Sequence, residues 1–246
     1  EIPNDASVLI FLGPKKEFSH NELLIVDKYL NRGGKLIVAL DPAFQGGSST
    51  NLRNFLLEKW GVGISNELVI DINKFVSGSK GTVPIASSFD ASILEGFGGT
   101  VFFPLVSRVY QGKKTNKNLK FKSLVQTSEF PSSWADKTPG ELIENEIKFH
   151  SGEDIPGPIT VVGISTNIGR VKTQVAVFGN ATFLQNSYAQ MGGNIDLFSR
   201  VVGFLTSENL LQSFNLPIHT NKPIVFTSKE KRNHFSLLIY TWCWDI

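Results

Sequence analysis

Four residues that could contact a ligand follow apolar runs of strand length: Gly13, Asp41, Asn180 and Thr182. In α/β proteins with parallel strands, ligands bind just beyond the carboxyl ends of the strands. These four residues therefore form a candidate site for a polar ligand or a partner. A structural role is the alternative, and we favour it: Asp41 before Pro42 can stabilise a turn, and Asn180 tolerates a left-handed backbone.

Motifs of common catalytic sites are absent from the sequence. It has no G-x-x-x-x-G-K-[ST] phosphate loop, no G-x-G-x-x-G, no H-E-x-x-H and no G-x-S-x-G nucleophile elbow. The single cysteine, Cys243, excludes an internal disulfide and a Cys-rich zinc site. The histidines are scattered singly along the chain (His20, His150, His219 and His234). We therefore expect no catalytic residue, no metal site, no cofactor and no enzymatic activity.

Composition narrows the class of protein further. The chain has 246 residues, 41% of them hydrophobic and 19% charged, which excludes a disordered polypeptide. Its 24 lysines and arginines against 22 acidic residues give a net charge of +2. A dedicated nucleic-acid binder usually carries a strong basic excess, so we expect no nucleic-acid partner.

The first part of the chain has the clearest pattern of elements. Ser7–Leu12 and Lys35–Leu40 are apolar runs of strand length. Between them, Ser19 and Glu22 fit a capping box, which predicts the start of a helix. Apolar residues follow at i, i+3 and i+7 and mark its buried face (Leu23, Val26 and Leu30). Strand, helix and strand predict a βαβ unit with two parallel strands.

The rest of the chain extends this pattern. A helix is expected over 51–60 with Gly61 as its stop, and a strand over 67–72. Strands over 158–165 and 171–178 are close enough for a hairpin. Asn194 is expected to cap a helix whose apolar face carries Ile195, Phe198, Val202 and Leu205. We expect one α/β domain over 1–220, with a mostly parallel sheet, flanking helices and a β-rich insertion at about 100–160. Two subdomains remain an alternative.

The segment 221–246 is expected to be a separate tail. After a basic cluster, Phe235–Ile246 is almost wholly apolar but is only about half as long as a membrane-spanning helix. Two interpretations stay open. The run is either a final buried strand or the start of a membrane anchor, whose tryptophans and tyrosine would suit a membrane interface.

Several stretches together resemble a known family. Asp5–Pro42, Trp60–Asp71, Leu124–Ala135 and Val175–Glu208 are similar to successive segments of the auxiliary domain found with ABC-type transport systems. This group includes the gliding-motility protein GldG. The opening βαβ unit also resembles flavodoxin-like and glutamine-amidotransferase-like folds, but the nucleophilic cysteine of the amidotransferases has no counterpart here.

The resemblance implies a function based on binding. It suggests a non-catalytic, extracytoplasmic (periplasmic) module that works with an ABC permease and ATPase, held at the membrane by helices outside this chain or at its end. Two alternatives stay open. One is a glycan- or small-molecule-binding protein that uses Trp60 and Trp134 as aromatic platforms. The other is a hydrolase or amidotransferase-like enzyme that uses His20 or His150 with Asp41.

Overall fold

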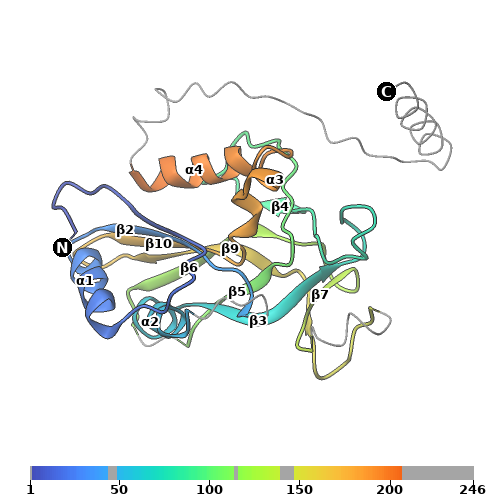
Figure 1. Cartoon of the computed structure of the whole chain (residues 1–246), viewed down its shortest axis with the longest axis horizontal. Helices are drawn as coiled ribbons and strands as arrows, with labels where there is room; N and C mark the ends of the chain where they lie inside the picture. The colour runs from blue at the N-terminus through green and yellow to red at the C-terminus, as the bar shows by residue number, and fades with distance from the viewer. Residues whose placement is uncertain (1, 44–48, 114–115, 139–146, 207–246) are drawn as a thin grey trace, which may run out of the picture.

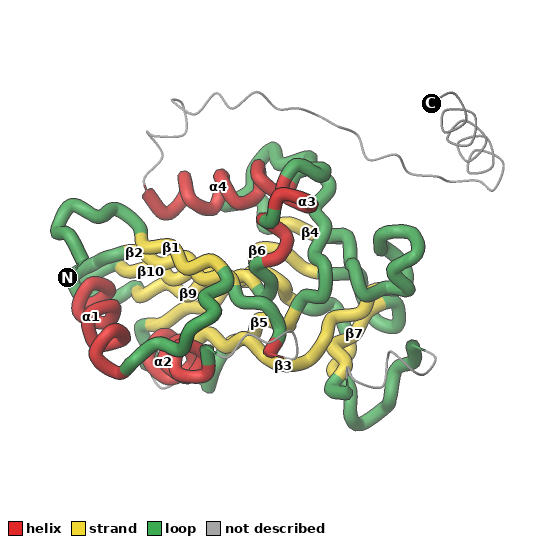
Figure 2. Tube along the Cα trace, in the orientation of Figure 1, coloured by secondary structure: helices red, strands yellow, loops and turns green. Residues whose placement is uncertain are grey.

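The computed structural model describes residues 2–43, 49–113, 116–138 and 147–206. Two β-sheets form its centre, with strand orders β1-β2-β10-β9-β6-β4 and β5-β3-β7-β8. Helices α1 and α2 lie on one side of the six-stranded sheet, and α3 and α4 lie on the other (Figures 1 and 2). The elements are β1 (Leu9–Leu12), α1 (His20–Asn31), β2 (Lys35–Ala39), α2 (Thr50–Trp60), β3 (Val62–Asp71), β4 (Ser88–Phe89), β5 (Ser107–Gln111), β6 (Leu119–Gln126), β7 (Ser133–Asp136), β8 (Ile155–Pro156), β9 (Thr160–Asn167), β10 (Thr173–Phe178), the 3-10 helix η3 (Thr182–Leu184), α3 (Asn186–Ala189) and α4 (Asn194–Thr206).

The predicted βαβ unit at the start of the chain is confirmed. Strands β1 and β2 pair in parallel, and α1 connects them. The capping box is formed: the Ser19 side chain accepts the Glu22 backbone N–H, and Glu22 accepts the Ser19 backbone N–H at 2.8 Å. The expected face of α1 is buried (Leu23, Val26 and Leu30). Local sequence signals and tertiary packing therefore agree in this region.

Helix α2 is capped by a residue from another segment. The two carboxylate oxygens of Glu17 accept the backbone N–H groups of Thr50 and Asn51, each at 2.8 Å. A carboxylate at this position satisfies free N–H groups and interacts favourably with the helix dipole. The helix ends at Gly61, as predicted. Helix α2 is thus tied to the turn that precedes α1.

The expected mostly parallel, flavodoxin-like or amidotransferase-like sheet is wrong. Among the strands that the structure describes, only the β1–β2 and β2–β10 pairs are parallel. The pairs β10–β9, β9–β6 and β6–β4 are antiparallel, and so is every pair of the four-stranded sheet. Parallel neighbours need long crossovers, usually helices. The described residues between 62 and 178 contain no α-helix, so their strands run antiparallel and the fold is mixed and β-rich.

The two faces of the six-stranded sheet bury different side chains of the same strands. On β2, Leu36 and Val38 pack with α1 and α2, while Ile37 and Ala39 pack toward α4. This alternation is the normal consequence of the pleat. Strand β2, which lies between β1 and β10, therefore has an apolar layer on each side.

Helix α4 begins at Asn194, as predicted, but its buried face differs in part from the predicted one. Leu205 is buried, and Phe198 and Val202 are partly buried against the core, whereas Ile195 is exposed. The buried residues also include Asn194, Leu197, Val201 and Gly203, so the buried face is rotated away from Ile195. Asn194 does not act as a simple cap, because its amide donates to the carbonyls of Phe102, Phe183 and Tyr188 and its oxygen accepts the Phe102 N–H.

Within the described ranges, the helices are all too short or too polar to cross a bilayer. The predicted tail at 221–246, including Phe235–Ile246, lies outside those ranges. Residues of the expected insertion at about 100–160 contribute β6 to one sheet and β5, β7 and β8 to the other. The domain boundaries stay a prediction.

The burial of the β2 side chains can be tested with two isoleucine substitutions, one at a buried residue and one at an exposed residue. Ile37→Ala removes a side chain that is 0% exposed and is expected to lower the free energy of unfolding by about 2–5 kcal/mol. Ile168→Ala removes a side chain that is 55% exposed, so a change of about 0.5 kcal/mol or less is expected. Urea unfolding measures both. Equal losses would contradict the described core.

Candidate functional site

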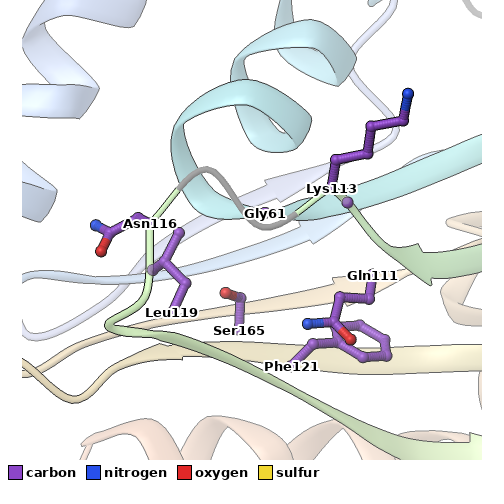
Figure 3. Close-up of a pocket in the computed structure, with 8 residues that line it drawn as sticks. Gly61, Gln111, Lys113, Asn116, Leu119, Phe121 and Ser165 are labelled. Carbon is purple, nitrogen blue, oxygen red and sulfur yellow. The ribbon is translucent and has the colours of Figure 1, made fainter.

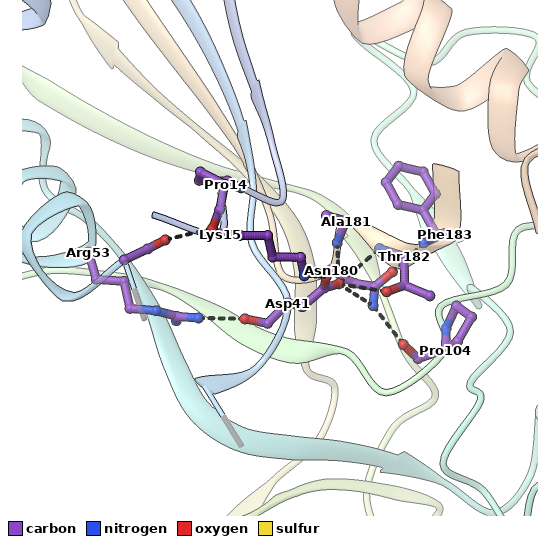
Figure 4. A network of polar contacts seen from close by, with 10 residues as sticks. Pro14, Lys15, Asp41, Arg53, Pro104, Asn180, Ala181, Thr182 and Phe183 are labelled. Atoms are coloured by element: carbon purple, nitrogen blue, oxygen red, sulfur yellow. Dashed lines mark hydrogen bonds and ion pairs between the residues drawn. The ribbon is translucent and has the colours of Figure 1, made fainter. Parts of the chain in front are cut away.

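The structure brings the four predicted site residues together. Gly13 follows β1, Asp41 follows β2, and Asn180 and Thr182 follow β10. Figure 4 shows Asp41, Asn180 and Thr182 close to one another. These three strands are neighbours and run parallel, so their carboxyl ends lie at one edge of the sheet. We call Gly13, Asp41, Asn180 and Thr182 the strand-end junction. Its role in binding stays a prediction.

Asp41 is the centre of this junction. Its Oδ1 accepts the backbone N–H groups of Ala181 at 2.8 Å and Thr182 at 2.9 Å, and the Thr182 hydroxyl at 3.0 Å (Figure 4). The Asn180 amide donates to the same oxygen at 3.3 Å. Lys15 lies 3.9 Å from Oδ2. The carboxylate therefore fixes the turn that leads from β10 into η3.

Asn180 joins this turn to a distant loop. The residue is 0% exposed; its Nδ2 donates to the Pro104 carbonyl at 2.6 Å, and its Oδ1 accepts the Phe183 N–H at 2.6 Å. Its hydrogen-bonding groups are thus used within the protein. This is the pattern of a structural asparagine.

Gly13 closes the junction from the side of β1. Its φ of +55° favours glycine, and an added Cβ would lie 3.2 Å from the Ala181 Cβ. The cavity lined by Gly13, Lys15, Asp41 and Arg53 has a volume of about 10 Å³. That is room for about one water molecule. The geometry of the junction therefore supports the structural alternative that we favoured from the sequence.

A second small cavity lies at the end of α2 (Figure 3). Its volume is also about 10 Å³, and Gly61, Leu119, Phe121 and Ser165 are among its lining residues. The Ser165 hydroxyl donates to the carbonyl of Trp60, the last residue of α2. The cavity is too small for a ligand larger than water.

Arg53 connects the junction to a much larger opening. From α2, its guanidinium donates to the Asp41 carbonyl at 2.7 Å and to the carbonyls of Ile64 and Ser65 at 3.2 and 3.3 Å. Burial lowers the pKa of Arg53, and interactions with Tyr110 and Asp41 offset part of that effect. An arginine still remains charged under these conditions. One buried cation thus links β2, α2 and β3.

The larger opening is a groove of about 510 Å³, which we call the α2–β3 groove. Ligand sites usually have volumes of about 300–1,000 Å³. The groove is lined mainly by α2, β3 and β5, together with Lys137 (Ala43, Thr50, Arg53, Asn54, Leu57, Gly63, Ile64, Ser65, Asn66, Glu67, Arg108, Tyr110 and Lys137). The sequence analysis did not find it, because its lining residues come from separate parts of the chain.

The lining of the α2–β3 groove is basic and polar. Arg53, Arg108 and Lys137 contribute three positive charges, and Glu67 contributes one negative charge. Arg108 forms an ion pair with Glu67 at 3.3 Å, and its guanidinium lies 4.5 Å from the centre of the Tyr110 ring. The pair neutralises Glu67, so the described lining residues keep a net positive charge that suits an acidic ligand or segment.

Two further details concern the wall of the groove. Arg53 Nε and Ser65 Oγ are buried and have no hydrogen-bond partner among the described residues. Such groups are rare in folded proteins. Gly63 permits the close approach of Tyr110, because an added Cβ would lie within the space of the Tyr110 ring. The tyrosine thus forms part of the groove wall.

The structure also bears on the two alternatives from the sequence. Trp60 and Trp134 are 4% and 2% exposed, so neither offers an aromatic platform for a sugar. Neither His20 nor His150 forms a hydrogen bond or an ion pair with Asp41. The proposed use of Asp41 with a histidine therefore lacks the required contact in this structure.

One group of residues could hold a metal ion. Ligand atoms of Asp136, His150 and Asp154 all lie within 4.8 Å of one another. Burial raises the pKa of Asp136; the Thr138 N–H opposes this, and the nearby Asp154 adds to it. The expectation of no metal site rested on scattered single histidines. The sequence alone does not reveal that Asp136, at the end of β7, lies close to His150.

The importance of Asp41 can be measured by substitution. Asp41→Ala leaves the N–H groups of Ala181 and Thr182 without their acceptor, so we expect a loss of about 3–5 kcal/mol in the free energy of unfolding. Lys15→Ala removes only a long contact from an exposed lysine and should cost at most about 1 kcal/mol. Urea unfolding of both variants decides the matter. An unchanged Asp41→Ala variant would contradict the structural role.

Comparison with solved structures shows the fold. The chain is similar to the "mmIFT52 N-terminal domain", with a TM-score of 0.59, 18% sequence identity, and coverage of 82% of this chain and 77% of that chain. At this identity the likeness concerns the fold alone. It agrees with the mixed, β-rich architecture and not with a flavodoxin-like sheet.

Comparison with sequences gives a family and two partial relatives. The intraflagellar transport protein 52 homologs of Homo sapiens and Mus musculus are each 36% identical, over 67 and 61 residues. These matches cover 27% and 25% of this chain, and only 15% and 14% of the relatives. A family described as "ABC-type uncharacterized transport system" matches residues 1–162. This match covers most of the described sequence and confirms the suspected resemblance: the chain belongs to the ABC-type transport system auxiliary family.

Proposed function

We propose that this chain is a non-catalytic, extracytoplasmic binding module of a transporter-associated auxiliary protein, and that it recognises its partner through the α2–β3 groove. Membership of the family supports association with an ABC transport system. The groove carries the rest of the proposal, because it is a large, open and charged site formed by described residues. Its location at the membrane exterior follows from the family resemblance, as does gliding motility as one possible setting.

The chemistry of the groove supports binding over catalysis. Among the lining residues that the structure describes there is no histidine or cysteine, and the one carboxylate, Glu67, is paired with Arg108. A general base or a nucleophile needs a group that is free to exchange a proton. The lining residues offer positive charge and hydrogen-bond donors instead. These groups suit the recognition of a carboxylate.

The charge of the groove also indicates the kind of partner. A positive groove attracts an acidic segment, and charge complementarity raises the rate and specificity of association. The permease is the ABC subunit that presents segments on both sides of the membrane. We therefore propose that an acidic extracytoplasmic segment of the permease occupies the groove, and that the ATPase associates with the domain through the permease.

Affinity capture from membranes tests this proposal. A tagged full-length protein in its native host should recover an ABC permease and its ATPase. The double variant Asn66→Glu/Lys137→Glu adds negative charge to two exposed lining residues whose side chains make no hydrogen bond in the described chain. Because the groove would then repel an acidic segment, we expect recovery to fall about tenfold.

A matched control carries the same change in charge elsewhere. Asn21→Glu/Lys120→Glu alters exposed residues of α1 and β6 that do not line the groove, so recovery should equal that of the wild type. Failure of the wild type to recover any ABC subunit would contradict the partner assignment. Equal recovery by both double variants would contradict the role of the groove.

A further inference from the structure

A second possible site lies in the four-stranded sheet, apart from the strand-end junction. Asp136 is the last residue of β7, and His150 and Asp154 bracket the turn before β8. Their ligand atoms lie within 4.8 Å of one another, and His150 Nδ1 is 3.5 Å from Asp154 Oδ2. The pairing of β7 with β8 brings these residues together.

The two carboxylates are buried without an arginine or lysine partner. Asp136 is 1% exposed and Asp154 is 7% exposed. Among the described residues, the ion pair of Asp154 is with His150, and Asp136 forms none. Buried carboxylates are stable only when they are neutralised, paired with a cation or bound to a metal. The cluster therefore has an excess of negative charge that an ion would balance.

Backbone donors hold both carboxylates in position. Asp154 accepts the N–H groups of His150 at 2.8 Å and Lys137 at 3.2 Å, and Asp136 Oδ1 accepts the Thr138 N–H at 2.8 Å. The second oxygen of Asp136 accepts no hydrogen bond from a described residue. This oxygen is therefore free to contact an ion that enters the cluster, and the residue that carries it is 1% exposed.

We propose that Asp136, His150 and Asp154 bind a divalent transition-metal ion of the zinc type. Imidazole suits Zn²⁺ better than Ca²⁺ or Mg²⁺, which prefer sites built from oxygen alone. Tetrahedral zinc with bonds of about 2.1 Å places its ligands about 3.4 Å apart, so the three side chains must close by up to about 1.4 Å. The His150 side chain is 48% exposed and is free to turn for this purpose.

The bound ion would act as a structural clamp. It would join the end of β7 to the turn before β8 and balance the charge of the two carboxylates. Its effect would also reach the α2–β3 groove, because Lys137 follows Asp136 and its N–H donates to Asp154. This inference stands independently of the proposed partner.

Calorimetric titration of the full chain with ZnCl₂, after removal of metal with EDTA, tests the site. Wild-type protein is expected to bind one zinc ion more than either Asp136→Asn or His150→Gln, or to bind it at least about 100-fold more tightly. The comparison with variants is required because His219, His234 and Cys243 can also bind zinc. Asp196→Asn, which alters a carboxylate that is 40% exposed, is the control and should bind as the wild type does.

Thermal unfolding gives a second readout, which distinguishes loss of the metal site from misfolding of the variant. Asp136→Asn removes a buried negative charge, so without metal its Tm is expected to exceed that of the wild type. Zinc should raise the Tm of the wild type by several degrees and leave that of the variant much less changed. Wild-type protein that binds no more zinc than Asp136→Asn and His150→Gln would overturn the proposal, as would equal zinc stabilisation of all three.

Discussion

The carboxylate of Asp41 is the interaction on which the rest of the structure depends. One of its oxygens accepts hydrogen bonds from Asn180, Ala181 and Thr182 and thereby fixes the path from β10 into η3. The backbone carbonyl of the same residue accepts a hydrogen bond from Arg53. Asp41, just after β2, thus makes two kinds of contact: its side chain binds the turn after β10, and its carbonyl binds Arg53 of α2. The side chain organises a filled junction, and the carbonyl positions a cation at an open groove.

This division agrees with the structural alternative for the four residues at the strand ends. The strand ends of a parallel sheet are the usual place for a ligand, but here the polar groups at those ends contact one another and leave a cavity of only about 10 Å³. The proposed binding surface lies instead on the side of α2. Arg53 passes from the junction to that surface, and Arg108 and Lys137 add further positive charge. Asp41 therefore contacts both regions: the turn after β10, where its hydrogen bonds contribute to stability, and Arg53, which lines the proposed binding groove.

Local signals in the sequence were sufficient for local structure. The capping box at Ser19 predicted the start of α1, and the two apolar runs around it predicted parallel strands. Strand direction further along the chain depends on which connections contain helices, and the apolar runs there do not reveal it. The hairpin expected over 158–178 is confirmed as the antiparallel pair β9–β10, but the other antiparallel pairs were missed for that reason. The groove and the Asp136–His150–Asp154 cluster depend on contacts between distant segments, such as Arg53 with Ile64 or Asp136 with His150, and no spacing rule identifies those contacts.

The capping of α2 by Glu17 has a consequence for the groove beside it. The first turn of this helix is bonded to the segment before α1, Arg53 in its middle is bonded to β3, and the carbonyl of Gly61 after its end accepts a hydrogen bond from Gly112. Helix α2 forms one wall of the groove, and these three contacts fix its position. It therefore loses little conformational freedom when a partner binds. The groove is therefore preorganised, and more of the energy of its contacts remains available as affinity.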